Sequence, residues 1–390
     1  MNRIKAQRIL IVTGEASGDL LASHLVEAMR AEDPSLFFFG MGGEKLRAAG
    51  AEIVFDIAQH AVMGITEVIG HLGKLYGVFR ELKLAIKRDR PDLVILVDYP
   101  DFNLRLASVA KHCRIPVLYY VSPQIWAWRT NRIKQIAASV STMIVVFPFE
   151  LPLYREAGVN AHFVGHPLLD IVKVSRSKED NRKHLGLSQH RTTIGLLPGS
   201  RISEVKRILP AMLEAARRLS LQFTDLQFII PIAPGLDQGE IEKLTEGTGS
   251  APTLVTNSMY EVIDSSFLVI VASGTASLET ALLAKPMVIV YRMSPLSYLI
   301  GKLLVKVSFI GMANIIAGKK VVPELIQSEA RAERIAGEAA RLLTDTAYYQ
   351  NVCAELALIK KQLGEPGASK RAAQIALTML RHRPEPVPVT

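Results

Sequence analysis

Short, uninterrupted apolar runs recur along this chain, and each is followed by a turn and a helix-like pattern. RILIVTGEASGDLLASHLVEAMR, from residue 8, has the order strand, glycine-rich turn, helix, and PDLVILVDYPDFNLRLASVAKHC, from residue 91, repeats it. Strands of a parallel sheet that is covered on both faces are apolar throughout rather than alternating. The repeated pattern therefore predicts an α/β fold of parallel sheets with helices on both faces.

The pattern occurs in two blocks. The chain has 390 residues, 49% of them hydrophobic, which is enough for two domains with separate cores. A polar, charge-rich stretch at 173–192 interrupts the pattern and is the expected linker. We expect two doubly wound, Rossmann-like domains, 1–172 and 190–350, that face a central cleft. Residues 351–390 should form C-terminal helices that pack back on an N-terminal domain, and end in a disordered, proline-rich tail.

Composition narrows the class of partner. The formal net charge of +9 favours anionic partners, such as phosphorylated small molecules or an acidic membrane surface. Nucleic acid is disfavoured, because the positive charge is scattered and no aromatic–basic platform occurs. Cys113 and Cys353 have no disulfide or zinc spacing, which favours a reducing cytosol. No run of about 20 apolar residues is free of charges, so no transmembrane helix is expected.

A turn in the second half has the features of a phosphate site. Gly199, Ser200 and Arg201 stand between an apolar run and a long helical pattern. A helix N-terminus presents unpaired N–H groups and a partial positive charge, glycine permits close approach, and the serine and arginine add donors. The alternative is a serine-capped helix that carries a surface arginine.

A second turn of this kind follows in VASGTASLE. Ser273, Gly274 and Thr275 lie between an apolar run and a helix, and Glu279 is placed to accept hydrogen bonds from ribose hydroxyls. A capping box is the alternative, although Leu278 stands where it needs an acid. Two such turns in one half predict a nucleotide-diphosphate site.

A carboxylate stands at the end of an apolar strand in LVILVDYPDFN. Asp98 is there a candidate general base, a role that contributes roughly 10²–10⁴-fold to rate, or else a turn-forming residue. Asp101 is expected to be a helix N-cap. No Asp-x-Asp and no cluster with metal spacing occurs in the sequence, so we expect neither metal nor cofactor. The charge of a leaving diphosphate would then be met by Arg201 and the helix ends.

The first half also holds candidates for an acceptor site. Gly14, Ser17 and Gly18 belong to the turn TGEASGD, whose acids disfavour phosphate, and we expect this turn to line the cleft on the acceptor side. Gln124 and Trp126, in SPQIWAWR, are candidates to bind a sugar or a lipid. Core packing is the alternative for the tryptophan.

Two amphipathic segments are candidates for contact with an anionic membrane surface or, alternatively, for ordinary core packing. One is the stretch 294–311, and the other begins near residue 63. The membrane or acyl-chain candidates in the latter are Met63, Val68, Ile69, Leu72 and Phe79.

Eight stretches together carry a resemblance that runs from end to end of the chain. They are GEASGD, AVMGITEVIGHL, VDYPDFN, YYVSPQIWAWR, VGHPL, LLPGSR, ASGTASLE and ANIIAGKKVVPELIQ. The chain resembles the bacterial lipid-A-disaccharide synthase family. That resemblance implies a GT-B-like inverting glycosyltransferase that joins UDP-2,3-diacylglucosamine to 2,3-diacylglucosamine 1-phosphate, giving a β-1,6 disaccharide 1-phosphate and UDP.

The resemblance also implies roles and a setting. Asp98 is the implied base for the acceptor 6-hydroxyl, Arg201 and the 273–279 turn are the implied UDP site, and Asn314 and Glu324 are expected to face the donor. It implies a cytoplasmic protein, peripheral on the anionic inner face of the inner membrane of Gram-negative bacteria, and a homodimer with exchanged C-termini. Other readings stay open from the residues alone: a UDP-N-acetylglucosamine 2-epimerase, the peptidoglycan glucosaminyl transferase, or a non-catalytic nucleotide-binding module at a membrane surface.

Overall fold

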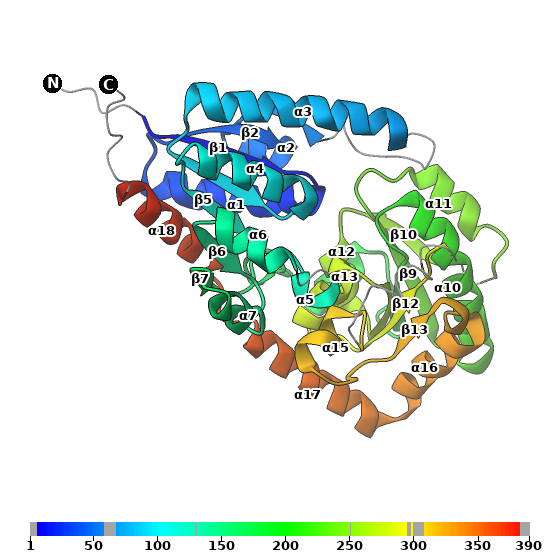
Figure 1. The fold of residues 1–390 in the computed structure, drawn as a ribbon. Helices are drawn as coiled ribbons and strands as arrows, with labels where there is room; N and C mark the ends of the chain where they lie inside the picture. The colour runs from blue at the N-terminus through cyan, green and yellow to red at the C-terminus, as the bar shows by residue number, and fades with distance from the viewer. Residues whose placement is uncertain are drawn as a thin grey trace, which may run out of the picture. The chain divides into compact units, whose positions relative to one another are not determined.

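The computed structural model describes residues 6–57, 68–128, 131–249, 251–294, 298 and 308–382 (Figure 1). The chain divides into two compact units. Unit 1 comprises Met1–Asp170 with Gly364–Thr390, and unit 2 comprises Ile171–Leu363.

Unit 1 is built on a seven-stranded sheet of order β3-β2-β1-β4-β5-β6-β7, in which every neighbouring pair is parallel. Its strands are β1 (Arg8–Thr13), β2 (Phe37–Gly42), β3 (Glu52–Asp56), β4 (Leu93–Val97), β5 (Val117–Tyr120), β6 (Thr142–Val145) and β7 (Ala161–Phe163). Its described helices are α1 (Ala16–Glu32), α2 (Glu44–Ala48), α3 (Val68–Asp89), α4 (Pro100–His112), α5 (Ile125–Trp128), α6 (Arg132–Ser139), α7 (Glu150–Glu156) and α18 (Ala368–Arg381), while α8 (Leu168–Ile171) lies at its boundary.

Helices cover both faces of this sheet, which explains the continuous apolar strands. In β4, Val94 and Leu96 join a core with α3, α4, α6 and α7, whereas Leu93, Ile95 and Val97 join a second core with α1, α2 and α18. All five side chains are fully buried. A strand between two cores has no solvent-facing side, so every position must be apolar.

Unit 2 contains a six-stranded sheet of order β10-β9-β8-β11-β12-β13, again parallel throughout. Its strands are β8 (Thr192–Leu197), β9 (Leu226–Ile232), β10 (Thr253–Thr256), β11 (Leu268–Ala272), β12 (Met287–Tyr291) and β13 (Glu324–Ile326). Its described helices are α9 (Lys178–His184), α10 (Ile202–Gln222), α11 (Gln238–Thr245), α12 (Met259–Ser265), α13 (Thr275–Leu282), α15 (Met312–Ala317), the 3-10 turn η3 (Gln327–Glu329), α16 (Ala332–Thr344) and α17 (Thr346–Gln362). Figure 1 shows α10 and α16 on one side of this sheet and α12 and α13 on the other.

The unit boundaries differ from those expected from sequence. The polar stretch 173–192 contains α9, which packs against α12 inside unit 2. Unit 2 also extends past residue 350, because α17 packs against α13, α15 and α16. The chain re-enters unit 1 at Gly364, and α18 packs there against α1.

Both sheets reverse their strand order at one place. In unit 1, β1 lies between β2 and β4, with Thr13 beside Val97 at the carboxyl ends. In unit 2, β8 lies between β9 and β11, with Leu197 beside Val271. Open α/β sheets bind ligands at such switch points, so the turns that follow β1, β4, β8 and β11 are where a site is expected.

Candidate active site

The turn after β4 has an unusual backbone. Asp98 and Tyr99 have φ values of 48° and 52°, in the left-handed region that residues other than glycine seldom adopt. Such a conformation costs of the order of 1–3 kcal/mol per residue and persists where the surroundings hold it. The turn raises Asp98 out of the strand at the switch point of unit 1.

Two side chains hold this turn, and sequence reasoning assigned a role to neither. Asn103, which is buried on α4, donates through Nδ2 to the carbonyls of Asp98 (2.7 Å) and Val97 (3.2 Å). The Tyr119 hydroxyl donates to the same Asp98 carbonyl at 2.6 Å. Burial raises the pKa of Tyr119 well above its ordinary value, so this donor keeps its proton. Asn103 belongs to the stretch VDYPDFN. An amide side chain among the core-facing positions of a helix is the sequence signal that could have identified it, because a buried amide needs hydrogen-bond partners.

The carboxyl group of Asp98 is hard to ionise. Burial, with a smaller contribution from the negative charge of Glu15, raises its pKa from 3.8 to about 6, against a hydrogen bond from the Tyr99 backbone that lowers it. A carboxylate with a raised pKa is a stronger proton acceptor than an ordinary aspartate, and it is still largely ionised at neutral pH.

Asp98 opens onto a cavity of about 240 Å³ within unit 1. The cavity is lined by Asp98, Pro100, Val121, Ser122, Gln124, Val146 and Phe147. These residues come from the turns after β4, β5 and β6, at the carboxyl edge of the sheet. Its wall offers polar groups from Asp98, Ser122 and Gln124 beside apolar ones, as expected of a site for a polar ring with apolar substituents.

The glycines of the first turn serve packing. A Cβ on Gly14 would lie 2.4 Å from ring atoms of Tyr99, and one on Gly18 would lie 2.2 Å from Thr13 Oγ1. The first glycine thus lets the ring of Tyr99 close over the turn after β1. Ser17 is exposed in the first turn of α1. Among the described residues that line the cavity, none comes from this turn, which lies at the neighbouring strand end.

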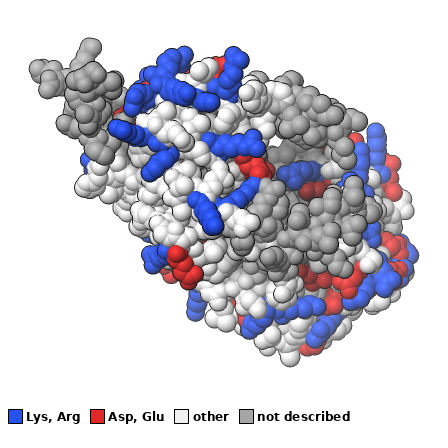
Figure 2. Space-filling view, in the orientation of Figure 1, with Lys and Arg blue, Asp and Glu red and all other residues white. Residues whose placement is uncertain are grey.

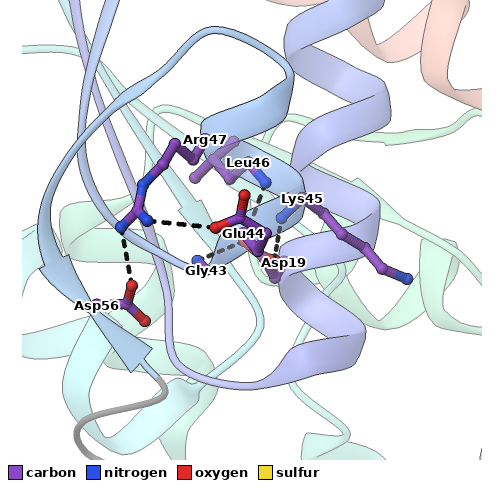
Figure 3. Close-up of polar contacts among 7 residues, drawn as sticks. All are labelled: Asp19, Gly43, Glu44, Lys45, Leu46, Arg47 and Asp56. Carbon is purple, nitrogen blue, oxygen red and sulfur yellow. Dashed lines mark hydrogen bonds and ion pairs between the residues drawn. The ribbon is translucent and has the colours of Figure 1, made fainter. Parts of the chain in front are cut away.

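The acid at the end of this turn is also structural. Asp19 on α1 accepts hydrogen bonds from the backbone N–H groups of Gly43 (2.6 Å), Lys45 (3.1 Å) and Leu46 (3.3 Å), and so caps α2 (Figure 3). Arg47 extends the network to Asp56 at the end of β3, with 2.8 Å between Nη2 and Oδ2. The second acid of GEASGD therefore joins α1 to α2 at the same edge of the sheet.

Of two further positions in unit 1, Asp101 differs from its expected role as an N-cap, whereas Trp126 packs against an aromatic ring, which was its alternative. Asp101 is not the N-cap of α4, because Pro100 takes the first helical position and Tyr99 the cap. Asp101 instead pairs with Arg132. Trp126 is half-buried beside Phe149, with 5.1 Å between ring centroids, and its Nε1 donates to Glu150 at 3.0 Å.

In unit 2, the turn after β8 leads into a long helix. Arg201 occupies the N-cap position of α10 without capping through its side chain, so Ser200 is not the cap. Both side chains are exposed, and Arg201 Nη1 lies 3.3 Å from Oε1 of Glu204. Gly199 has a φ of 123°, and a Cβ there would lie 2.8 Å from the Glu204 carboxylate. The N-terminus of α10, a place where backbone N–H groups have no partner within a helix, thus lies beside a guanidinium group.

The turn after β11 lies on the neighbouring strand. Gly274 is the N-cap of α13, with a φ of 155° and open space where a Cβ would stand. Thr275 is exposed, and the Ser273 hydroxyl donates to the Ile310 carbonyl at 3.3 Å. Two helix N-termini therefore begin at one switch point, which is an arrangement suited to an anion.

Glu279 is less open to a ligand than the sequence suggested. Its side chain is 7% exposed, and its Oε1 accepts a hydrogen bond from the Tyr260 hydroxyl at 2.8 Å. Burial and the Glu279 carboxylate raise the pKa of Tyr260, which therefore stays protonated. Glu279 joins α13 to α12 in this structure.

Asn314 and Glu324 form one internal network beside these turns. Asn314 is 0% exposed; its Nδ2 donates to Glu324 Oε1 (2.7 Å) and its Oδ1 accepts from the Val321 backbone (2.7 Å). Glu324 also accepts from the N–H groups of Ile310 (2.9 Å) and Gly311 (3.0 Å), which fixes the start of α15. With these and further backbone bonds, the Asn314 amide has no hydrogen-bonding capacity left for a ligand. In this conformation both side chains hold the loop that Ser273 contacts, and the expectation that they face the donor stays a prediction.

The membrane candidates are only partly described. Met63 lies outside the described residues, as do the side chains of Val68, Ile69 and Leu72, whose backbone belongs to α3. Phe79 packs on the core, with its ring edge-on to Phe102 at 5.6 Å between centroids. The stretch 295–307, apart from residue 298, is outside the described residues.

The described part of the chain contains no group of three or more His, Cys, Asp or Glu side chains arranged to hold a metal ion. None of its helices is both long enough and apolar enough to cross a membrane.

Comparison with solved structures gives the fold. The chain is similar to the UDP-N-acetylglucosamine 2-epimerase of Neisseria meningitidis, solved with UDP-N-acetylglucosamine bound, at a TM-score of 0.66 and 12% identity, covering 95% of this chain and 100% of that one. It is also similar to the calicheamicin glycosyltransferase CalG4, at a TM-score of 0.63 and 14% identity, covering 97% and 99%. At these identities the likeness shows a two-domain, Rossmann-like fold of the GT-B type and nothing about the reaction.

Comparison with sequences gives the family. The chain is 47% identical to the lipid-A-disaccharide synthase of Geobacter sulfurreducens, over 97% of this chain and 99% of that protein. It is 47% identical to that of Myxococcus xanthus, over 96% and 97%. A family model described as lipid-A-disaccharide synthetase matches residues 9–379. This chain therefore belongs to the lipid-A-disaccharide synthetase family.

Proposed function

We propose that this chain is an inverting glycosyltransferase that joins UDP-2,3-diacylglucosamine to 2,3-diacylglucosamine 1-phosphate. The products are the β-1,6-linked lipid A disaccharide 1-phosphate and UDP. The observation that carries the proposal, beyond family membership, is Asp98: a carboxyl group of raised pKa, held at a switch point and facing a cavity.

Asp98 serves as the general base for the acceptor. Its ionised carboxylate takes the proton from the 6-hydroxyl of the acceptor sugar, and that oxygen forms a bond to the anomeric carbon of the donor. The bond from this carbon to the β-phosphate oxygen breaks, and its electron pair leaves with UDP. A single displacement inverts the α-linked donor to a β-linked product. Asp98 then returns its proton to solvent.

Unit 2 binds the nucleotide of the donor. The N-termini of α10 and α13, with Ser200, Ser273, Thr275 and Arg201, supply donors for the diphosphate, and Gly199 and Gly274 permit close approach. Glu279 accepts from ribose hydroxyls with the acceptor capacity that its bond from Tyr260 leaves. Asn314 and Glu324 act on the donor indirectly, because they hold the loop that precedes α15.

The test is to follow both substrates with the purified protein. Mass spectrometry should show one disaccharide 1-phosphate formed for each UDP released, and NMR should show a β-1,6 linkage. Conversion of the UDP-sugar without a disaccharide would favour the epimerase reading, and UDP-sugar binding without turnover would favour a non-catalytic module.

We propose that turnover needs no metal ion, since a guanidinium group and two helix N-termini are present to stabilise the departing diphosphate. Rates should be unchanged after dialysis against EDTA. Loss of activity that added magnesium restores would contradict this.

We also propose a peripheral position on the anionic inner face of the inner membrane, in the cytoplasm. From Val78 onward, α3 buries Val78, Leu82 and Ile86 in the core, so its other face is outward. Tyr76 (71% exposed) and Leu84 (48% exposed) lie outside the core. Figure 2 shows Lys and Arg gathered where Figure 1 places α3, and the exposed cations among the described side chains of this helix are Arg80, Lys83, Lys87 and Arg88. Cations beside an exposed aromatic and an exposed aliphatic residue suit an anionic interface.

Flotation with vesicles tests this position. The protein should float with vesicles that contain phosphatidylglycerol and much less with phosphatidylcholine alone. Lys83→Glu with Lys87→Glu should reduce flotation, whereas Lys370→Glu, on the exposed side of α18, is the matched control. Equal flotation of all variants would contradict a role for α3.

Finally, we propose a homodimer with exchanged C-termini. α18 is joined to unit 2 through Gly364 and Gly367, with φ values of 88° and 96°, and it docks on α1, where Asp170 accepts from the N–H groups of Gly367 and Ser369. A partner's α18 has the same docking site available by exchange. Light scattering should give the mass of two chains; the mass of one chain at micromolar concentration would contradict the exchange.

A further inference from the structure

Glu150 is a buried carboxyl group next to the cavity, and the proposed reaction does not use it. It is the first residue of α7 and is 1% exposed. Its Oε2 accepts from the Ser122 hydroxyl (2.8 Å) and from the Phe147 backbone N–H (3.2 Å), and its Oε1 accepts from Trp126 Nε1 (3.0 Å). One side chain thus joins the turn after β5, helix α5 and the turn after β6.

A second residue of α7 holds the same segment. Tyr154 lies one helical turn after Glu150 and is fully buried, and its hydroxyl donates to the Pro123 carbonyl at 3.0 Å. Burial raises the pKa of Tyr154, so the hydroxyl keeps its proton. The 122–126 segment is therefore fixed by α7 at Ser122, Pro123 and Trp126.

The fixed segment carries part of the cavity wall. Ser122 and Gln124 line the cavity together with Asp98, and Gln124 is exposed. The segment begins from strained backbone, because Val121 has a φ of 66°. A β-branched residue in the left-handed region persists only where its surroundings hold it, and α7 provides that support.

We propose, on the basis of the proposed function, that Glu150 is a positioning residue for the acceptor sugar. With Tyr154, it sets where Gln124 stands beside Asp98, and it thereby controls acceptor binding without touching the substrate.

The chemistry of the contacts favours a carboxylate over an amide at this position. Ser122, Trp126 and Phe147 all present donors, and an ionised carboxylate accepts from all three. An amide has one acceptor oxygen, so glutamine must leave at least one of these groups unpaired or turned away. Burial raises the pKa of Glu150 to about 7, against hydrogen bonds from the Ser122 and Trp126 side chains and from the backbone of Phe147 and Val146, which lower it.

The experiment compares Glu150→Gln and Tyr154→Phe with the parent, using the intact protein and both lipid substrates. A lost buried hydrogen bond corresponds to roughly three- to tenfold in a binding constant. We expect the acceptor KM to rise about tenfold in Glu150→Gln and about threefold in Tyr154→Phe. The KM for UDP-2,3-diacylglucosamine should stay within about twofold, and kcat should fall less than the acceptor KM rises.

Glu156→Gln is the matched control, since Glu156 lies on the same helix and is exposed. It should leave both KM values unchanged. Ser122→Ala, combined with Glu150→Gln, should add less than the two single changes together, because the two residues share a bond.

The outcomes are distinct. An unchanged acceptor KM in folded Glu150→Gln, or equal rises for donor and acceptor, would overturn the inference. If Glu150→Gln does not fold, an unchanged acceptor KM in Tyr154→Phe overturns it instead. A parent protein that forms no disaccharide would count against the proposed function, whereas an active parent with indifferent variants would count only against Glu150.

Discussion

The two sheets have the same topology at their switch points and opposite chemistry. In unit 1, the turns after β1 and β4 carry Glu15 and Asp98, and the negative charge of Glu15 adds to the cost of ionising Asp98. In unit 2, the turns after β8 and β11 carry Arg201 and two helix N-termini. The same architecture thus presents the proposed base in unit 1 and the proposed anion site in unit 2.

The difference lies in how each turn is made. Unit 2 uses Gly199 and Gly274, whose positive φ values cost little, and so exposes backbone N–H groups. Unit 1 forces Asp98 and Tyr99 into the left-handed region and fixes them through Asn103 and Tyr119. A glycine turn presents backbone N–H groups, which suit a phosphate. A strained aspartate turn presents a carboxylate side chain, which suits the proton of a hydroxyl group.

The largest effect should come from Asp98→Asn. Loss of the base should lower kcat by about 10²–10⁴-fold, measured as disaccharide formed per second. Asp101→Asn, which changes the neighbouring carboxylate paired with Arg132, is the control and should retain activity. An active Asp98→Asn protein would contradict the proposed role of Asp98 as the general base.

The same substitution should make the protein more stable. The pKa of Asp98 is raised from 3.8 to about 6 on folding, so the stability from its bound proton is present below about pH 4 and is lost as the pH rises through 6. At pH 7 the fold therefore carries the cost of a buried charge, at most about 3 kcal/mol. Asparagine removes that charge and tolerates the left-handed region. The thermal midpoint should rise at pH 7 and shift little at pH 4.

Arg201→Ala should have the next largest effect, on the opposite edge. Loss of the guanidinium group should lower kcat/KM for the UDP-sugar by about 10²-fold and weaken inhibition by UDP, while the acceptor KM stays near that of the parent. Arg201→Lys should recover only part of this, because lysine lacks the bidentate fork. A rise in the acceptor KM alone would contradict the proposal that unit 2 binds the UDP-sugar.

The pH dependence of kcat/KM distinguishes the proposed base in unit 1 from the proposed anion site in unit 2. Because the base must be ionised, kcat/KM should fall about tenfold for each pH unit below about 6 and level off above it. Arg201→Ala should keep this inflection at a lower rate. Glu150→Gln should keep it as well, although it removes another buried carboxyl group of this edge, one whose pKa is about 7. An inflection that moves with Glu150 would assign the base elsewhere.

The smallest effects should come from two buried asparagines, one in each unit. Asn103→Ala and Asn314→Ala each leave buried carbonyl or N–H groups unpaired and should each lower the free energy of unfolding by about 1–3 kcal/mol. Asn103→Ala should affect kcat, since it releases the Asp98 turn, whereas Asn314→Ala should affect the donor KM through the 311–324 loop. The same kinetic change in both variants would show that the hydrogen bonds of Asn103 and Asn314 do not act separately on the acceptor side and the donor side.

Much of this arrangement was predictable from local patterns. Apolar runs such as LVILV require a strand buried on both faces, and the glycine turns mark where strands pass into helices. These patterns predicted the α/β class, the parallel strands and the positions of Asp98, Arg201 and Gly274 at strand ends. Local patterns did not predict the internal hydrogen bonds of Glu279 and Asn314, because their partners Tyr260 and Val321 are brought to them by folding.

The sequence by itself determined which residues stand at the carboxyl ends of strands, since that depends only on the order of short segments. The tertiary structure alone decided what those residues experience. The pKa of Asp98 depends on burial and on Glu15, which is 83 positions away, and its backbone depends on Tyr119 and Asn103. The support from Glu150 likewise joins the 122–126 segment to the start of α7, which are more than 20 positions apart in the chain. Burial, hydrogen bonding and charge act through space, and so they follow only once the sheet has brought its strand ends together.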